Sequence, residues 1–232
     1  MVVKYTGSKV KISDKIGKDD LYLLHHGEVC CDIQCRDRNA PVVVVLESPW
    51  HLEHFLQRPA TGWTGAILCA IFEEVRKKLP PSFKNIASSF CTQEAALLNV
   101  AKDYLPFKKD AQTSKRLAAK EFIDSQPDEY KTMVEGFGER IRKNIDISSV
   151  RVALLMGQLS WGTRDCFCPS SKVIELYHPS YIGRNKKFGG DVVARARFVA
   201  AYILHCLKHT ERNDSIDGFN NYLKLNDKLH FI

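Results

Sequence analysis

The sequence predicts an α/β protein with three layers, α/β/α, in which helices cover both faces of a central, mostly parallel four-stranded sheet. Two observations predict this fold. Four short apolar runs, at residues 42–46, 95–100, 150–156 and 173–177, are typical of buried strands. Longer segments with helical periodicity separate most of them, and such alternation is typical of a parallel sheet.

The first strand and the first helix have the clearest patterns. The run at 42–46 contains four valines and a leucine and is bounded by Pro41 and Pro49, which predicts a strand buried on both faces. Apolar side chains then recur at helical spacing over residues 67–75. Lysines and Pro80 follow, so we expect a helix over about 62–79.

The later elements follow the same alternation. Residues 107–147 are polar and mostly helical in pattern, with Pro127 at a helix start. After the third and fourth strands, residues 191–208 form a long amphipathic pattern that predicts a helix. The polar tail at 210–232 gives no firm prediction.

Length and composition favour one globular domain. Of the 232 residues, we assign 39–232 to a single α/β domain and 1–38 to an N-terminal extension packed on it. No apolar run reaches the roughly 18–20 residues of a membrane span, and the N-terminus lacks the pattern of a signal peptide. We therefore expect a cytoplasmic protein that is a monomer and does not bind membranes.

The charge balance and the cysteines limit which partners and cofactors are expected. Lys and Arg total 34 against 27 Asp and Glu, and this net charge of +7 is compatible with a nucleic-acid partner. The eight cysteines lack the paired Cys-x-x-Cys spacing of zinc and iron–sulfur sites. We expect free thiols, no metal and no cofactor, with metal binding by some cysteines as the alternative. Cys69 and Cys206 lie in helix-like apolar contexts that predict core positions.

Three predicted strands deliver polar residues at their carboxyl ends. These residues are Glu47, Asn99 and His178. In open α/β sheets, ligands bind at this edge. A carboxylate, an amide and an imidazole are therefore expected to form a site.

Four motifs in this region resemble those of one family. Residues 46–65 contain Glu-Ser-Pro-Trp-His-Leu-Glu and Arg-Pro-Ala-Thr-Gly-Trp-Thr-Gly, residues 98–102 read Leu-Asn-Val-Ala-Lys, residues 155–157 read Leu-Met-Gly, and residues 178–180 read His-Pro-Ser. In this order they resemble the uracil-DNA glycosylase superfamily, most closely its iron–sulfur enzymes from bacteria and archaea. The resemblance spans residues 42–185 and implies a uracil-DNA glycosylase-like fold and cleavage of an N-glycosidic bond.

Departures from the family motifs shift the expected substrate. A cluster cysteine of the family falls at Asp103, and the phenylalanine that stacks on a flipped uracil falls at Ala60. The first motif is more similar to a subset that includes defence enzymes acting on modified cytosine in phage DNA, among them glucosylated hydroxymethylcytosine. The resemblance therefore implies that the space at Ala60 admits a bulkier base.

The resemblance and the chemistry of glycosidic cleavage give the residues near the reacting bond their expected roles. Glu47 stabilises the oxocarbenium-like sugar and orients or deprotonates water. Glu53 is a second carboxylate, either supporting or active, and Ser48 falls at the alternative water-holding position of the family. His178 donates a hydrogen bond to O2 of the leaving pyrimidine.

Two further side chains are expected around the base. Asn99 pairs with the base edge, and its amide reads uracil or cytosine according to its orientation. Trp50 lines the pocket. For all these residues the alternative is a structural role: a loop-capping carboxylate, a solvent-facing carboxylate, a hydrogen-bonded histidine, a turn asparagine or a core tryptophan.

The segment after His178 is the expected DNA contact. It offers a hydroxyl, two apolar side chains and three cations, namely Ser180, Tyr181, Ile182, Arg184, Lys186 and Lys187. Tyr181 or Ile182 is expected to wedge into the base stack once the target base has left it. A solvated basic loop is the alternative.

The resemblance therefore implies a monofunctional DNA glycosylase. It takes a flipped nucleotide from duplex or single-stranded DNA, with modified cytosine as the leading substrate and uracil as the alternative. A catalytically silent nucleic-acid-binding module and a small nucleotide or nucleoside hydrolase are the competing classes.

Overall fold

Four parallel strands form the centre of the structure. The computed structural model describes residues 5–6, 9–10, 33–49, 53, 59–102, 105, 118–209 and 213–227. Its central strands, in chain order, are β4 (Val42–Leu46), β5 (Ala96–Asn99), β6 (Val152–Met156) and β7 (Lys172–Leu176). They lie parallel in the order β5-β4-β6-β7. The predicted four-stranded parallel sheet is therefore confirmed.

Two short strands extend this sheet at its edges. β3 (Ile33–Gln34) pairs antiparallel with β5, and β8 (Asn213–Asp214) pairs parallel with β7. Each has two residues, too few for a hydrophobic period, so the sequence pattern did not indicate them. Strands β1 (Tyr5–Thr6) and β2 (Lys9–Val10) form a separate antiparallel pair. Most of the predicted N-terminal extension lies outside the described residues.

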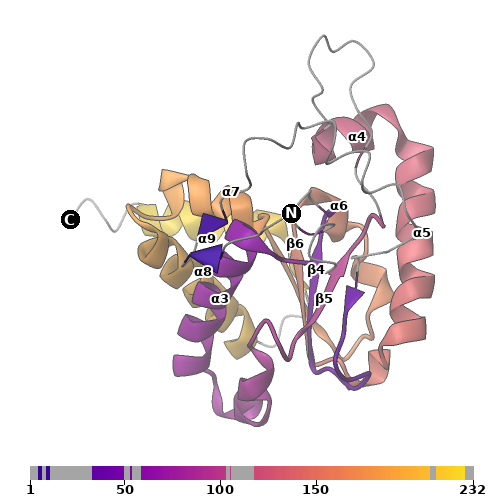
Figure 1. Cartoon of the computed structure of the whole chain (residues 1–232). Coiled ribbons are helices and arrows are strands. Elements are labelled where there is room, and N and C mark those ends of the chain that lie inside the picture. Colours follow the sequence, from indigo (N-terminus) through magenta and orange to yellow (C-terminus); the bar gives the residue numbers. More distant parts are fainter. Residues whose placement is uncertain are drawn as a thin grey trace.

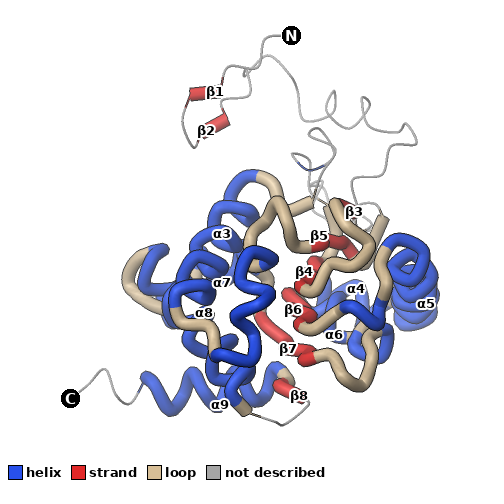
Figure 2. The backbone as a smooth tube through the Cα atoms, turned by 90° about the horizontal axis from the view of Figure 1, so that it is seen from below, coloured by secondary structure: helices blue, strands red, loops and turns tan. Residues whose placement is uncertain are grey.

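Helices cover both faces of the sheet (Figures 1 and 2). One face carries α3 (Gly62–Lys77), α7 (Pro179–Arg184), α8 (Val192–Lys208) and α9 (Ile216–Asp227), and the other carries α4 (Ala119–Ser125), α5 (Pro127–Asn144) and α6 (Gln158–Trp161). Strand β4 shows why its run is wholly apolar: Val42, Val44 and Leu46 face the α3 layer, while Val43 and Val45 face the α5 layer.

The helices follow their sequence signals. The five predicted apolar side chains of α3 are all buried, and Arg76 and Lys77 lie in its last turn. Asp191 caps α8 by accepting a hydrogen bond from the backbone N–H of Ala194 at 2.8 Å. The predicted core position of Cys206 is confirmed, but that of Cys69 is wrong, because Cys69 lies on the exposed face of α3.

Short 3₁₀ helices complete the described part of the chain: η1 (Pro81–Ser89), η2 (Ile147–Ser149), η3 (Arg164–Cys166) and η4 (Lys186–Phe188). Within the described ranges, the helices are either too short or too polar to cross a membrane.

Candidate active site

The carboxyl ends of the parallel strands meet at one edge of the sheet, where the predicted site residues lie. Glu47 directly follows β4, Asn99 ends β5, and His178 lies two residues beyond β7. The register pairs Leu46 with Asn99, so Asn99 lies beside the residue that precedes Glu47. Gly157 follows β6, which lies between β4 and β7. The sheet thus brings the three predicted strand-end residues to one edge.

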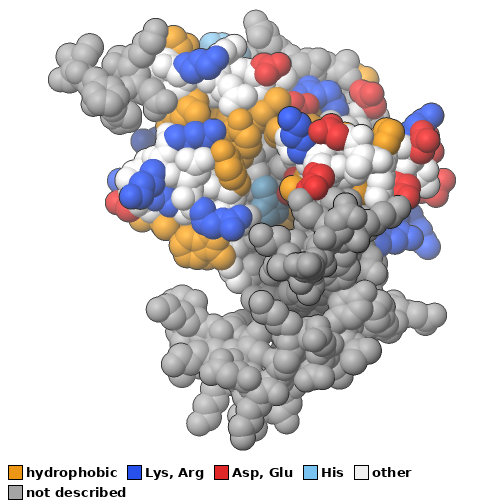
Figure 3. Space-filling view, turned by 90° about the horizontal axis from the view of Figure 1, so that it is seen from above, with side chains coloured by type: hydrophobic (Ala, Val, Ile, Leu, Met, Phe, Trp, Pro, Cys, Tyr) orange, Lys and Arg blue, Asp and Glu red, His pale blue; other side chains and the backbone are white. Residues whose placement is uncertain are grey.

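A cavity of 860 Å³ opens at this edge. Glu47, Gly157 and His178 line it from the strand ends, residues 61–64 line it from the start of α3, and Arg184 lines it from α7. Seen from above, a histidine lies in a hollow with hydrophobic, Lys and Arg side chains beside it (Figure 3). The cavity is near the upper end of the roughly 300–1,000 Å³ that is typical of sites for drug-sized ligands.

Glu47 is a carboxyl group with a strongly raised pKa. Burial raises its pKa from the ordinary 4.5 to about 7, and hydrogen bonds from the backbone N–H groups of Leu159 and Gln158 moderate this rise. Gly157 has a φ of +110° and packs against the Glu47 side chain. A carboxyl group with a pKa near 7 is suited to accept a proton from water at neutral pH.

His178 is a neutral imidazole with one nitrogen already occupied. Burial and, secondarily, the positive charge of Arg184 lower the pKa of His178 from 6.5 to about 4. Its Nδ1 accepts a hydrogen bond from the backbone N–H of Ser180 at 3.3 Å, so Nδ1 carries no proton. The remaining proton of the neutral ring is therefore on Nε2, which makes Nε2–H a hydrogen-bond donor.

Ser180 and Arg184 extend this arrangement. The Ser180 hydroxyl lies 2.8 Å from His178 Nδ1 and donates to it, because Nδ1 is an acceptor. Arg184 Nε donates to the Ser180 carbonyl oxygen at 2.9 Å, and its Nη2 lies 3.4 Å from the Ser180 hydroxyl oxygen. The arginine therefore supports the serine that fixes the orientation of the imidazole.

Asn99 is fully buried, and its side-chain nitrogen and oxygen have no hydrogen-bond partner among the described residues. Its carbonyl oxygen, in contrast, accepts a bond of 2.9 Å from Arg140 Nη2, which also donates to the Val100 carbonyl oxygen at 2.6 Å. A buried amide without partners is costly, so this side chain is suited to a ligand that supplies them. Asn99 is not among the residues that line the cavity in this structure.

The predicted residues of the first motif divide into two groups. Ser48 lines the cavity, and so does Glu53, which is buried. Trp50 lies outside the described residues. Two carboxyl groups, Glu47 and Glu53, therefore face one cavity.

Ala60 differs from its predicted role. It is buried in the core beneath α3 and is not among the cavity-lining residues. Its φ of +54° places it in the left-handed region, which is uncommon for residues other than glycine. The next residue, Thr61, does line the cavity, and in the part of the chain that the structure describes its buried hydroxyl has no hydrogen-bond partner. Ala60 itself therefore contributes no surface to this cavity.

The predicted DNA-contacting segment is only partly available. Ser180, Tyr181 and Arg184 line the cavity, and Tyr181 is 40% exposed. Ile182 is fully buried and offers no surface to DNA in this arrangement. Of the two predicted wedge residues, Tyr181 is the accessible one.

The two lysines of this segment lie in different surroundings. Lys186 is exposed. The ammonium nitrogen of Lys187 lies 4.7 Å from the ring centre of Tyr177, 5.0 Å from that of Phe188 and 5.3 Å from that of Tyr181. Lys187 is thus engaged in cation–π contacts beside the cavity.

Arg195 was missed in the sequence analysis. It is buried in α8, and its three guanidinium nitrogens donate to the carbonyl oxygens of Gly183, Gly189 and Gly190. Arg195 lies four residues before the buried Val199 and therefore on the apolar face of α8. An arginine among the apolar positions of the predicted helix was the sequence signal that could have identified Arg195.

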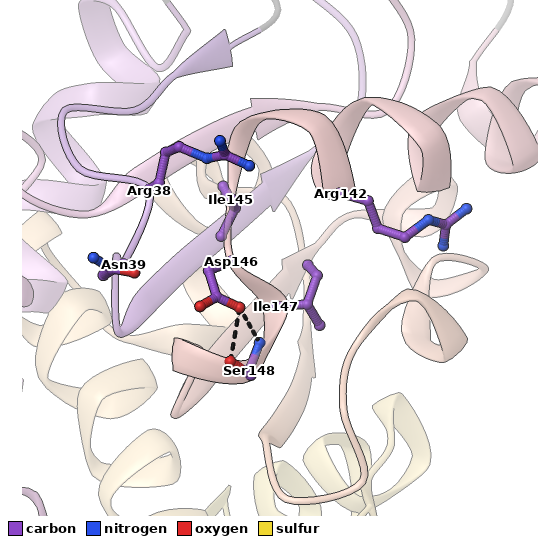
Figure 4. A pocket seen from close by; sticks show the side chains of 7 residues that line it. All are labelled: Arg38, Asn39, Arg142, Ile145, Asp146, Ile147 and Ser148. Atoms are coloured by element: carbon purple, nitrogen blue, oxygen red, sulfur yellow. Dashed lines mark hydrogen bonds between the residues drawn. The ribbon is translucent and has the colours of Figure 1, made fainter.

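A second hollow, of 530 Å³, lies among residues that precede β4 and β6, at the opposite edge of the sheet (Figure 4). Its Asp146 carboxylate accepts hydrogen bonds from the backbone N–H and the hydroxyl of Ser148, and therefore caps η2. No histidine, and no carboxylate other than Asp146, is among the residues that line it. This hollow offers no counterpart to the Glu47 and His178 pair.

Models of known protein families give no match, and neither do curated proteins. In the described ranges, no three His, Cys, Asp or Glu side chains are grouped to hold a metal ion. The fold is α/β with a parallel four-stranded sheet.

Proposed function

We propose that this chain is a monofunctional DNA glycosylase of the uracil-DNA glycosylase superfamily. The observation that carries the proposal is the pairing of Glu47 and His178 across one cavity. The surroundings move the pKa values of the two groups in opposite directions, toward a carboxyl group near 7 and an imidazole that stays neutral. Such separation of two titratable groups is typical of catalytic sites.

The proposed role of the His178 imidazole is to stabilise the leaving base. Cleavage of the N-glycosidic bond leaves negative charge on the departing pyrimidine, largely on O2. The neutral Nε2–H of His178 is suited to donate to that oxygen, since Ser180 holds the other ring nitrogen. A fixed donor aimed at a developing charge is worth roughly 3–4 kcal/mol of transition-state stabilisation.

The proposed role of the Glu47 carboxylate is to stabilise the sugar cation and to activate the attacking water. As the base departs with the bonding electrons, positive charge develops on the sugar, and ionised Glu47 stabilises it. Glu47 then accepts one proton from water as the oxygen bonds to the anomeric carbon. Glu53, which is buried at the same cavity, is placed to orient this water or to support Glu47.

Base recognition is assigned to Asn99. Its amide has no partner among the described residues, and it would offer a donor and an acceptor to a pyrimidine edge that reaches beyond the side chains now lining the cavity. Both uracil and cytosine fit such a group, so Asn99 does not decide between them. The cavity volume of 860 Å³ exceeds the size of a bare pyrimidine, and this favours a substituted base such as glucosylated hydroxymethylcytosine. We assign the protein to defence against phages that carry such DNA, with uracil repair as the alternative.

Contacts with the DNA backbone are assigned to residues at the rim of the cavity. Arg184 provides a cation there. Thr61 provides a buried hydroxyl, without a partner among the described residues, at the start of α3, whose first turn holds no acidic side chain. A helix N-terminus of this kind favours phosphate oxygens. The net charge of +7 acts in the same direction at longer range.

The test compares base release from three matched duplex oligonucleotides that contain cytosine, uracil or glucosylated hydroxymethylcytosine at one position. Abasic sites are scored by alkaline cleavage. Wild-type protein is expected to act fastest on the glucosylated base, whereas Glu47→Gln retains DNA binding and loses at least about 100-fold in rate. Efficient release of uracil with the glucosylated duplex left intact would assign the protein to repair. Release of no base, or normal release by Glu47→Gln, would refute the catalytic assignment.

A further inference from the structure

An exposed tryptophan stands at the mouth of the cavity. Trp63 is the second residue of α3, lines the cavity and is 49% exposed. The other exposed large hydrophobic side chains, among the residues whose burial is described, are Tyr181, Val193 and Leu225. Trp63 and Tyr181 therefore bring two of these four side chains to one rim.

The Trp63 ring is held in place by a close approach of two helices. A Cβ atom at Gly183 would lie 2.6 Å from the indole nitrogen of Trp63 and 2.9 Å from side-chain carbons of Ile67. Only glycine at position 183 allows the indole to lie against the backbone of α7 in this way. The ring is thus packed on one side and open to solvent over about half of its surface.

The surroundings of this ring fit a nucleobase better than an apolar protein surface. Arg184 follows Gly183 directly and lines the same cavity, and polar Thr64 and Ser180 lie on the same rim. A rigid aromatic face beside a cation is the combination that binds single strands, because bases stack on the ring while the cation attracts the backbone. A ring fixed in advance loses little conformational entropy on binding.

We propose that Trp63 is a base-stacking residue that holds a nucleobase next to the extruded nucleotide against the rim formed by α3 and α7. This inference rests on the proposed action on DNA and adds to it a strand-binding contact that does not depend on the identity of the excised base. The sequence motifs gave Trp63 no role.

The test measures binding of the full-length protein to a short thymidine single strand with one central tetrahydrofuran abasic analogue. Because this probe contains no target base, binding is measured separately from catalysis. Trp63→Ala is expected to weaken binding about 5- to 150-fold without changing its salt dependence, since stacking releases no counterions. Trp63→Phe is expected to recover most of the affinity. Leu225→Ala, a substitution of another exposed hydrophobic side chain, serves as the control.

Intrinsic fluorescence gives a second readout. Trp63 is one of three tryptophans, and Trp161 is hydrogen-bonded through its indole N–H to the Leu176 carbonyl oxygen. Stacking is expected to quench wild-type fluorescence during the titration, and Trp63→Phe is expected to abolish most of this quenching. Should Trp63→Ala fail to fold, the quenching difference between wild type and Trp63→Phe decides the question.

The outcomes separate this inference from the proposed function. Base release by wild type with unchanged affinity in Trp63→Ala, or unchanged quenching in Trp63→Phe, would overturn the stacking role and leave the glycosylase intact. Loss of affinity and quenching in a protein that releases no base would support the stacking role and refute the glycosylase. A wild-type protein that does not bind the probe would overturn the stacking role directly.

Discussion

Gly157 packs so closely against Glu47 that a Cβ atom at position 157 would lie 2.4 Å from Glu47 Cγ and 2.7 Å from Oε1. The glycine also has a φ of +110°, which side-chain-bearing residues rarely adopt. The turn after β6 therefore fixes the position of the carboxylate that follows β4. Residues from two neighbouring strands act as one unit at the sheet edge.

Gly157→Ala is expected to displace the Glu47 carboxylate and to lower the rate of base release about 100-fold, because a shift of about 1 Å in a catalytic group costs this much. DNA affinity should change little. Gly136→Ala is the matched control, since a Cβ at Gly136 meets no atom within 4 Å. A wild-type rate in Gly157→Ala, measured in single turnover, would contradict the coupling of Gly157 to Glu47.

The pH dependence of catalysis should report Glu47 alone. The ionised carboxylate is the active form and its pKa is about 7, so the rate is expected to rise about tenfold per pH unit below pH 7 and to level off above it. His178 is expected to add no further change of rate with pH between pH 5.5 and 9, because its pKa lies near 4. The measurement is a single-turnover rate profile from pH 5.5 to 9. A rising limb that persisted in Glu47→Gln would assign the titration to another group.

The same carboxyl group should make the protein less stable at high pH. The raised pKa of Glu47 means that the folded state holds its proton more tightly than the unfolded chain does between about pH 4.5 and 7. The free energy of unfolding therefore falls as pH rises through this window, by at most about 3 kcal/mol from this residue. Glu47→Gln removes the penalty and is expected to raise the Tm by several degrees at pH 8 and by little at pH 5.

Thermal melts at the two pH values check this expectation. The exposed Glu139 in α5 supplies the control variant Glu139→Gln, for which no pH-dependent gain is expected. A gain for Glu47→Gln that was equal at pH 5 and pH 8 would contradict the linkage to Glu47 ionisation. His178 is present in both the wild type and the variant, so its own titration cancels in the comparison.

The cations near the cavity should differ in their contributions to DNA binding. Arg184→Ala is expected to weaken binding to all sequences and to lower the slope of log affinity against log salt concentration by about one. Lys187→Met should lower it less, because the Lys187 ammonium lies over three aromatic rings. Lys131→Met, in the exposed part of α5, is the control. Equal salt slopes for wild type and Arg184→Ala would mean that Arg184 does not contact DNA and that the DNA-binding surface lies elsewhere.

Sequence pattern was sufficient for the parts of the fold that depend on local periodicity. Unbroken apolar runs predicted the four parallel strands, because a strand buried on both faces needs apolar side chains at every position. The same rule located Glu47, Asn99 and His178 at one edge, since parallel strands end on the same side. The two-residue strands β3 and β8 carry too few residues to show a period.

The remaining features of the site depend on contacts between segments far apart in sequence. The pKa of Glu47 reflects burial and backbone donors at the start of α6, about 110 residues away. The buried position of Ala60 depends on the packing of α3, which the motif alignment does not describe. Ile182 is buried for the same kind of reason, although its neighbours Tyr181 and Arg184 are exposed.

The three carbonyl oxygens bound by Arg195 have a consequence for the dynamics of the cavity rim. Segment 183–190 contains no long helix or strand of its own, yet a buried guanidinium of α8 connects both of its ends to the helix layer. Opening the segment would leave that charge without its acceptors, so native-state hydrogen exchange in this segment should require a cooperative opening shared with α8 rather than local fraying. Segment 183–190 would then already be ordered before DNA binds. The rate of association between protein and DNA would be limited by diffusion and charge rather than by loop closure.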